Sequence, residues 1–421
     1  MLGKFTALGV CIALAFTIAD AAAQSAPKRG QDVKEREQER QSADEYAAVG
    51  ERVGSFKFLP TIDADLEYGT NLFATSTGEQ SDFLTRVRPG VAFNSDWNNH
   101  QLNLTAEAEA VRHYRFNDDD VVNYDYGANG RVDVLRSLNI SFGAGYAQVH
   151  EGRGDPNAVS TAKSPTAGTN TTANIGIEYK PNKLSLSLDA TYKEDDLDDD
   201  INRDGSVTNN DDRDKEKIEL TARLGYEYLE NTEAFLKASS NKISYVSSFD
   251  DGGANRSSDG YSVVLGTGLD FTGLVTGQVF AGYISQSNDD LVLDDIAAPT
   301  LGATVDWSAT PLISIRGNVA RSIQESTTDG TAGYVSTSTT ISADYEILRQ
   351  LTASAELDWT LDRYDRIGKE DNFYKTVIGL KYLLNRYVSA DMKNTFKRKT
   401  SNSDDAAYTQ NTTMLTLSGQ F

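Results

Sequence analysis

In the stretch from Leu351 to Leu361, every odd position is apolar and every even position is polar. In an α-helix these apolar side chains would scatter around the axis, whereas in a β-strand they line one face. The stretch therefore predicts a strand with one apolar face and one polar face. Because the same pattern recurs from residue 54 to the end of the chain, the sequence predicts a protein built from many two-faced strands.

About eighteen segments show this alternation. They are long compared with the strands of soluble proteins, which average about five or six residues, and they suffice to cross a membrane, which takes about nine to eleven. The lengths therefore favour a membrane barrel over a soluble protein of two stacked sheets. The predicted strands lie near 55–68, 82–95, 100–115, 121–135, 138–150, 169–180, 183–194, 215–229, 232–246, 258–271, 274–286, 297–308, 311–325, 333–347, 350–363, 371–384, 386–398 and 407–421.

The connections between these segments alternate between tight turns and long polar loops. This alternation predicts an all-β fold, a closed antiparallel up-and-down transmembrane β-barrel of about 18 strands, with short periplasmic turns, long acidic extracellular loops and both termini in the periplasm. The tight turns centre on Asn98-Asn99, Arg136-Ser137, Pro181-Asn182, Glu230-Asn231, Thr272-Gly273, Ala309-Thr310, Arg349-Gln350 and Asn385-Arg386. The long loops lie near 69–81, 116–120, 151–168, 195–214, 247–257, 287–296, 326–332, 364–370 and 399–406.

The N-terminal part divides into two segments before the barrel. An apolar run follows Lys4 and ends in three alanines at 21–23, which predicts a secretory signal peptide over 1–23. Residues 24–53 mix both charges with almost nothing apolar to bury, which predicts a flexible, charged periplasmic extension. The barrel then occupies 54–421. The single cysteine, Cys11, leaves with the signal, so the mature chain is expected to contain no disulfide and no thiolate metal site.

The chain has a formal net charge of −22 at pH 7, and removal of the signal would not change it, because the charges of Lys4 and Asp20 cancel. A strongly acidic chain is a poor candidate for binding nucleic acid. If the apolar strand faces point to lipid, the polar faces line a lumen in which both signs of charge are interspersed. The candidate lumen and substrate-path residues are Arg86, Arg88, Glu107, Glu109, Asp125, Arg131, Asp133, Asp189, Glu219, Arg223, Glu227, Arg316, Glu356, Asp358, Lys375, Lys381, Asp391 and Lys393.

Catalytic and metal motifs are few. The three histidines, His100, His113 and His150, have no serine or cysteine partner in a recognisable motif, so no enzymatic activity and no required cofactor are predicted. The segment from Asp200 to Asp211 has oxygen-bearing side chains at the spacing of a calcium loop and a glycine at its sixth position. Two interpretations are open: this extracellular loop binds calcium, or it is an acidic loop that is merely solvated. The candidate ligands are Asp200, Asn202, Asp204, Ser206, Thr208 and Asp211.

Several short motifs resemble one family. They are Glu67–Phe73 (EYGTNLF), Ser81–Phe83 (SDF), Arg88-Pro89, Ser95–Trp97 (SDW) and Glu151–Pro156 (EGRGDP). The chain resembles the family named Putative beta-barrel porin 2. The resemblance runs from about residue 50 to the end, and it implies a barrel in the outer membrane of a Gram-negative bacterium, often encoded beside exopolysaccharide or capsule machinery. It transfers no site residues.

The end of the chain carries a second resemblance. Leu415, Leu417 and the terminal Phe421 lie in an alternating strand similar to the C-terminal signal of bacterial outer-membrane barrels, which the barrel-assembly machinery reads. Gly419 stands where that signal often has another aromatic residue. The expected surroundings are therefore outer-membrane lipid and lipopolysaccharide.

The functional expectation combines the lumen and the family resemblance. We expect a passive outer-membrane conduit for the export of an exopolysaccharide or capsular polysaccharide, with the secreted polysaccharide as cargo and an export lipoprotein or other periplasmic machinery as partner. The alternatives are a general or nutrient diffusion porin and a structural or adhesive surface barrel. The sequence does not separate these three.

Overall fold

The computed structural model describes residues 46–155, 157–271, 273–326, 330–364, 366–403 and 407–421. Nineteen strands pair in one sheet, and without the short β1 (Glu51–Val53) eighteen long strands remain. These are β2 (Phe56–Gly69), β3 (Asp82–Ser95), β4 (His100–His113), β5 (Val121–Leu135), β6 (Leu138–His150), β7 (Ala167–Tyr179), β8 (Leu184–Leu197), β11 (Lys215–Leu229), β12 (Thr232–Tyr245), β13 (Ser258–Phe271), β14 (Val275–Asn288), β15 (Ile296–Thr310), β16 (Ile313–Glu325), β17 (Gly333–Leu348), β18 (Leu351–Tyr364), β19 (Glu370–Leu383), β20 (Val388–Ser401) and β21 (Tyr408–Gln420).

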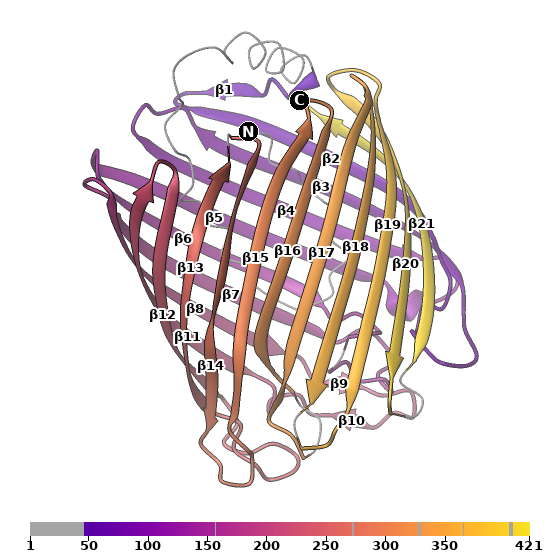
Figure 1. Cartoon of the computed structure of the whole chain (residues 1–421). Coiled ribbons are helices and arrows are strands. Elements are labelled where there is room, and N and C mark those ends of the chain that lie inside the picture. Colours follow the sequence, from indigo (N-terminus) through magenta and orange to yellow (C-terminus); the bar gives the residue numbers. More distant parts are fainter. Residues whose placement is uncertain (1–45, 156, 272, 327–329, 365, 404–406) are drawn as a thin grey trace.

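The sheet closes on itself. Each long strand pairs antiparallel with its neighbours in sequence, and β2 pairs with β21 from Thr61 opposite Gln420 to Gly69 opposite Thr412. β1 and the C-terminus lie at one end of the barrel, while the loop strands β9 (Asp200–Ile201) and β10 (Val207–Thr208) lie at the other (Figure 1). No helix among the described residues is long and apolar enough to span a membrane.

The predicted closed, antiparallel, up-and-down barrel of eighteen strands is confirmed, and its strand ends agree with the structure to within about three residues. One turn prediction was wrong. Ala309-Thr310 belongs to β15, and the turn follows at 311–312. The reason is an irregularity in the pairing with β16 between Ser308 and Thr310, which lengthens β15 before the chain reverses.

Two predicted segments lie largely outside the described residues, namely the signal peptide and most of the 24–53 extension. The described end of the extension includes β1, which pairs with the first residues of β2. Near it, the side chain of Gln420 donates to the backbone oxygen of Tyr46 at 2.9 Å. This part of the chain therefore lies beside the end of β21.

The exposure of side chains is inverted relative to a soluble protein. Apolar side chains on alternate positions point outward, as with Leu357, which is 55% exposed, whereas the side chain of the next residue, Asp358, is 23% exposed. Soluble proteins bury the first kind of residue and expose the second. We call the side with the exposed apolar residues the outer face and the opposite side the lumen face. The inversion fits a barrel whose outer face meets lipid.

This face assignment predicts the effect of two neighbouring substitutions on β18. Leu357→Arg should lower the stability of the folded barrel in lipid by about 2 to 4 kcal/mol, because it places a cation against hydrocarbon. Asp358→Asn should cost much less, since the amide can still accept from the Thr340 hydroxyl, which now lies 2.5 Å from the carboxylate. Urea unfolding of both variants in vesicles measures the difference. Equal losses at the two positions would show that the faces are assigned wrongly.

Candidate functional site

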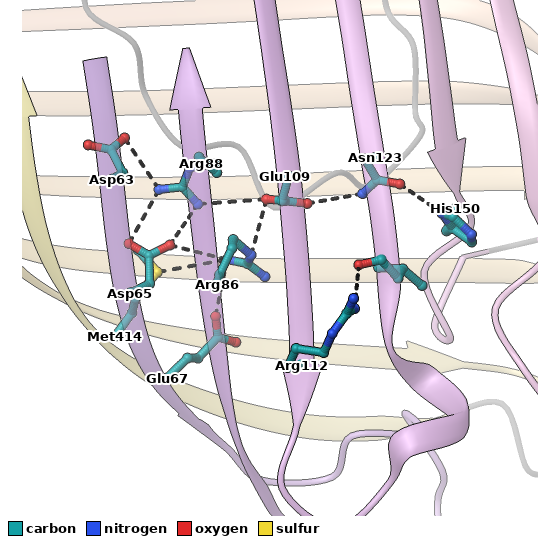
Figure 2. Close-up of polar contacts among 11 residues, drawn as sticks. Asp63, Asp65, Glu67, Arg86, Arg88, Glu109, Arg112, Asn123, His150 and Met414 are labelled. Atoms are coloured by element: carbon teal, nitrogen blue, oxygen red, sulfur yellow. Dashed lines mark hydrogen bonds and ion pairs between the residues drawn. The ribbon is translucent and has the colours of Figure 1, made fainter. Parts of the chain in front are cut away.

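The lumen face of β2, β3 and β4 carries a dense set of ion pairs, which we call the lumen cluster. It consists of Asp63, Asp65, Glu67, Arg86, Arg88 and Glu109. In the barrel ladder, Asp63 lies opposite Arg88 and Asp65 lies opposite Arg86, so pairing of β2 with β3 brings the opposite charges together. Figure 2 shows these side chains on neighbouring strands, in a chain of contacts that continues through Asn123 to His150.

Arg88 is at the centre of the lumen cluster. Its Nη1 atom lies 2.7 Å from Asp65 Oδ2 and 3.7 Å from Glu109 Oε2, and its Nη2 atom lies 3.6 Å from Asp63 Oδ2. The side chain of Asp65 is fully buried and that of Arg88 is 9% exposed. Charged side chains that are buried this far from water are stable only while they remain paired.

Arg86 completes the cluster and ties β2 to β4. Its Nη1 atom lies 3.2 Å from Glu67 Oε2, and its Nε atom lies 3.1 Å from Glu109 Oε2. The cluster therefore holds two guanidinium groups and four carboxylates, so it carries an acidic excess. Both arginines are paired with carboxylates, so neither guanidinium group of the cluster is free to bind another anion.

All the lumen residues predicted from sequence lie on the lumen face, and most are in ion pairs. The pairs outside the cluster that include predicted residues are Arg131–Asp133, Lys217–Glu219, Arg223–Glu233, Lys180–Glu227, Arg316–Asp344, Lys375 with Glu356 and Asp358, and Lys393–Asp391. Glu107 and Asp125 lie opposite each other in the ladder, two like charges that add to the acidic excess. Asp189 and Lys381 also lie on this face. Their role as a substrate path stays a prediction.

Three connections, those that follow β2, β4 and β6, pack together over part of the barrel end opposite β1. We call them the roof. The connection 151–166 follows β6, but Gly154 reaches far from that strand. A Cβ atom at Gly154 would lie 3.0 Å from Ala74 Cβ and 3.0 Å from the hydroxyl of Tyr408, the first residue of β21. In the barrel, β6 and β21 are separated by β5, β4, β3 and β2. The connection therefore runs across the mouth of the barrel instead of standing above its own strands.

The family motifs hold this roof together. Asn71 is fully buried, and its amide donates to the backbone oxygens of Thr75 and Thr409 at 2.8 and 2.9 Å. Arg153 pairs with Asp119 at 2.6 Å and donates to the backbone oxygen of Ala162 at 2.8 Å. Its guanidinium also lies 5.7 Å from the ring centre of Phe73. The motifs thus have a structural role, because they join three connections that are distant in sequence.

Phe73 is also the centre of an open depression in this roof. Its ring packs edge-on against Phe116 with centroids 5.0 Å apart, and Arg203 lies over its face at 5.3 Å. The depression has a volume of about 510 Å³, and its lining carries both signs of charge, Arg115, Lys163 and Arg203 with Asp118 and Asp119. It is built by the same contacts that hold the roof.

The predicted calcium segment forms a hairpin, in which β9 pairs with β10 and Gly205 takes a φ of 86° at the turn. The amide of Asn202 donates to the hydroxyls of Ser206 and Thr208, and Asp204 accepts from Ser206. Asp200 accepts from Thr166 and Asn210, and Asp211 from Asn209. Across the part of the chain that the structure describes, no three His, Cys, Asp or Glu side chains gather as a metal site would require. Calcium binding here stays a prediction.

Sequence reasoning missed several residues of the site. Asp63, Asp65 and Glu67 lie on the polar face of the first strand, and that position could have identified them. Arg153 and Asp155 lie in a connection without any periodicity, so no pattern could have placed them. The histidines do not form a catalytic arrangement: among the described residues, His150 contacts Asn123, His113 contacts Asp120, and His100 accepts from the backbone of Asp133.

The closed barrel and its charged lumen define a class, the porin-like β-barrel channels. The chain belongs to the family described as Putative beta-barrel porin 2, whose model matches residues 44–421. This is a family of channels rather than of enzymes, and a place in the bacterial outer membrane is consistent with it. The family resemblance seen in the sequence is thereby confirmed. No curated protein matches the sequence significantly.

Solved structures of similar shape include three outer-membrane proteins. OpdK from Pseudomonas aeruginosa is 11% identical, with 87% of this chain and 99% of that chain covered and a TM-score of 0.43. OccK2 (OpdF) from the same organism is 10% identical, with coverage of 88% and 98% and a TM-score of 0.46. OccAB4 from Acinetobacter baumannii is 10% identical, with coverage of 86% and 98% and a TM-score of 0.44.

The burial of Arg88 leads to a stability prediction. Arg88→Met leaves Asp65 with only a 3.9 Å contact to Arg86, and the loss of one partner from a buried pair should cost roughly 3 to 5 kcal/mol. The matched control is Arg363→Met, which breaks the exposed pair with Glu370 and should cost less than about 1 kcal/mol. Urea unfolding in vesicles measures both. A loss at Arg88 no larger than that at Arg363 would contradict the buried cluster.

The roof should respond to pH through Asp155. Burial is the main cause that raises the pKa of Asp155 from 3.8 to about 6, against the lowering effects of the Gly152 N–H and of Lys397. The folded roof therefore binds this proton more tightly than the unfolded loop does, so the roof is most stable below about pH 4 and loses stability as the pH rises through about 6.

This pH dependence can be measured with a spin label on a cysteine introduced at the exposed Ser160, which is expected to be the only cysteine of the mature protein. The label should become more mobile between pH 4 and pH 6. Asp155→Asn should remove the change, because the amide does not titrate. A transition that persists unchanged in Asp155→Asn would assign it to another group.

Proposed function

We propose that the barrel is a passive channel in the export of an exopolysaccharide or capsular polysaccharide. The observation that carries the proposal is the state of the lumen charges, most of which are paired with each other along the wall. Between these pairs, the lumen face presents short hydroxyl and amide side chains, such as Ser338, Ser342 and Asn241. Such a wall offers a sugar chain many weak contacts and no single strong one, which permits movement where one tight site would hold the polymer.

The proposal assigns the driving force elsewhere. In this proposal the channel is passive, and the polymer is pushed by its synthesis or by periplasmic machinery such as an export lipoprotein. The family resemblance, which includes neighbours in polysaccharide gene clusters, supports this cargo. The alternatives stay a general or nutrient porin and a structural or adhesive barrel.

The charge of the channel adds an expectation about ions. The chain carries a formal net charge of −22 at pH 7, and the lumen cluster has four carboxylates against two arginines. A lumen with an acidic excess raises the local concentration of cations. We therefore expect cations to pass more easily than anions, and a neutral or partly cationic polymer to enter more readily than a polyanion.

The function can be tested in two steps. In planar bilayers, the purified barrel should conduct with a preference for cations, and the polysaccharide of the source strain should partly block the current. Neutral dextran of similar size is the control and should block less. In cells, deletion of the gene should leave the polymer inside the envelope and reduce it at the surface.

Each outcome points to one reading. Unchanged surface and secreted polysaccharide in the deletion strain, together with slower uptake of small solutes, would replace export by the nutrient-porin alternative. A barrel that conducts no ions at all, with unchanged polysaccharide, would favour the structural or adhesive reading.

A further inference from the structure

The ladder between β15 and β16 stops halfway along the two strands. Their last pair is Gly302 with Ala320. Beyond it, β15 continues to Ile296 and stays paired with β14, while β16 continues to Glu325 and stays paired with β17. The first residues of β15 and the end of the β16–β17 hairpin therefore separate from each other at the end of the barrel that carries the long loops.

The separated end of the hairpin lies inside the barrel. Ile323 and Val335 share a strand face with residues that point outward lower down, such as Ile341, which is 51% exposed. They nevertheless pack against Ile296 and Ala298, which lie on the lumen face of β15. The outer face of the hairpin end thus rests on the inner face of the wall.

A hydrogen bond confirms this placement. The hydroxyl of Thr300, on the lumen face of β15, donates to the backbone oxygen of Arg321 at 2.7 Å. A side chain that points into the lumen can reach the backbone of β16 only if that backbone lies on the lumen side of β15. The hairpin end, residues 321–337 without the undescribed 327–329, is therefore an element inside the channel.

Two sets of contacts hold the hairpin end in this position, one with strands β11 and β12 and one with the connection that follows β12. Glu325 forms an ion pair with Lys215 of β11 and accepts from the hydroxyl of Tyr245 of β12 at 3.2 Å. β11 lies five places from β16 among the eighteen long strands, so the hairpin end extends along the inside of the wall from β15 to β11. In addition, Arg256 of the connection 246–257 donates to the backbone oxygens of Ser326 and Thr331. We call these contacts the latch.

We propose that the hairpin end is a gate with two positions, a latched one inside the lumen and an open one in the wall. In the open position β16 would continue its ladder with β15, and the existing register would place Ile323 opposite Pro299. Ile323 and Val335 would then face outward, as their alternation along β16 and β17 already requires. The open position gains ladder hydrogen bonds, and the latched position gains the ion pairs and the apolar contacts.

The two positions are discrete because a different set of contacts stabilises the hairpin end in each. An intermediate position has neither the ladder nor the latch, so it is less stable than both. Opening removes the hairpin from the lumen and widens the channel at its loop end. The gate rests on the channel function but not on the identity of the cargo, and ion current reports it directly.

A reversible disulfide tests the gate in the intact barrel. The mature protein is expected to have no cysteine of its own, so Ala298→Cys with Val335→Cys gives a single pair, between side chains that touch only in the latched position. Oxidation should form the bond and lower the open probability in planar bilayers several-fold, and a reductant should restore it. The control pair is Ala303→Cys with Val319→Cys, which are ladder partners of the same strands below the split. Its oxidation should leave the current unchanged.

A second variant tests the latch from the other side. Glu325→Gln removes the charge that pairs with Lys215 and should raise the open probability several-fold without affecting heat-modifiable migration of the folded barrel. The proposal is overturned if the oxidised Ala298/Val335 pair conducts like its reduced form, or if that pair fails to oxidise while the control pair does. Glu325→Gln with an unchanged open probability would overturn the latch.

Discussion

The structure depends on one constraint, that backbone N–H and C=O groups surrounded by hydrocarbon must find partners in a neighbouring strand. In hydrocarbon there is no water to replace a missing partner, so a sheet can cross a membrane only when it closes. The first long strand closes the barrel by pairing with the last one, from Thr61 with Gln420 to Gly69 with Thr412. Because the ladder provides the hydrogen bonds of the backbone, the side chains can be apolar on the face toward lipid and polar on the face toward the lumen.

The same ladder determines the electrostatics of the lumen. Residues directly opposite each other in neighbouring strands are close enough for their side chains to interact. Asp63 meets Arg88, Asp65 meets Arg86 and Asp358 meets Lys375 for this reason alone. Charges that would be costly when isolated are therefore paired along the described wall, and the lumen face keeps a polar surface. The register, and not any local motif, brings these opposite charges together.

The sequence could predict the features that repeat with a short period. Strand positions, the two faces and the lumen residues all follow from alternation, because each depends on neighbours one or two places away. The ion-pair partners could not be predicted in the same way, since they depend on the register across connections as long as that from Gly69 to Asp82. The sequence could not predict two contacts of the roof either, that of Gly154 with Tyr408 and that of Asn71 with Thr409, because they join residues far apart in the chain.

The Asp200 to Asp211 segment illustrates why a motif can be ambiguous. A calcium loop and a short hairpin both need a glycine at a sharp turn and oxygen-bearing side chains near it. In the structure, Gly205 supplies the turn, and the side chains of Asn202, Ser206 and Thr208 bond to each other. Spacing alone does not distinguish side chains that face a cation from side chains that close a hairpin.

The end of β16 shows the opposite case, in which the alternation is clear and the structure departs from it. Ile323 and Val335 continue the outward pattern of their strands, yet they lie against the inner face of β15. When a local pattern and the observed position disagree, the difference marks a place where function competes with the most regular fold. The loop-end half of the ladder between β15 and β16 is absent there, and contacts with Lys215, Tyr245 and Arg256 take its place. Both that hairpin and the described part of the connection after β6 lie at the loop end of the barrel, so the departures from a regular wall gather at that end.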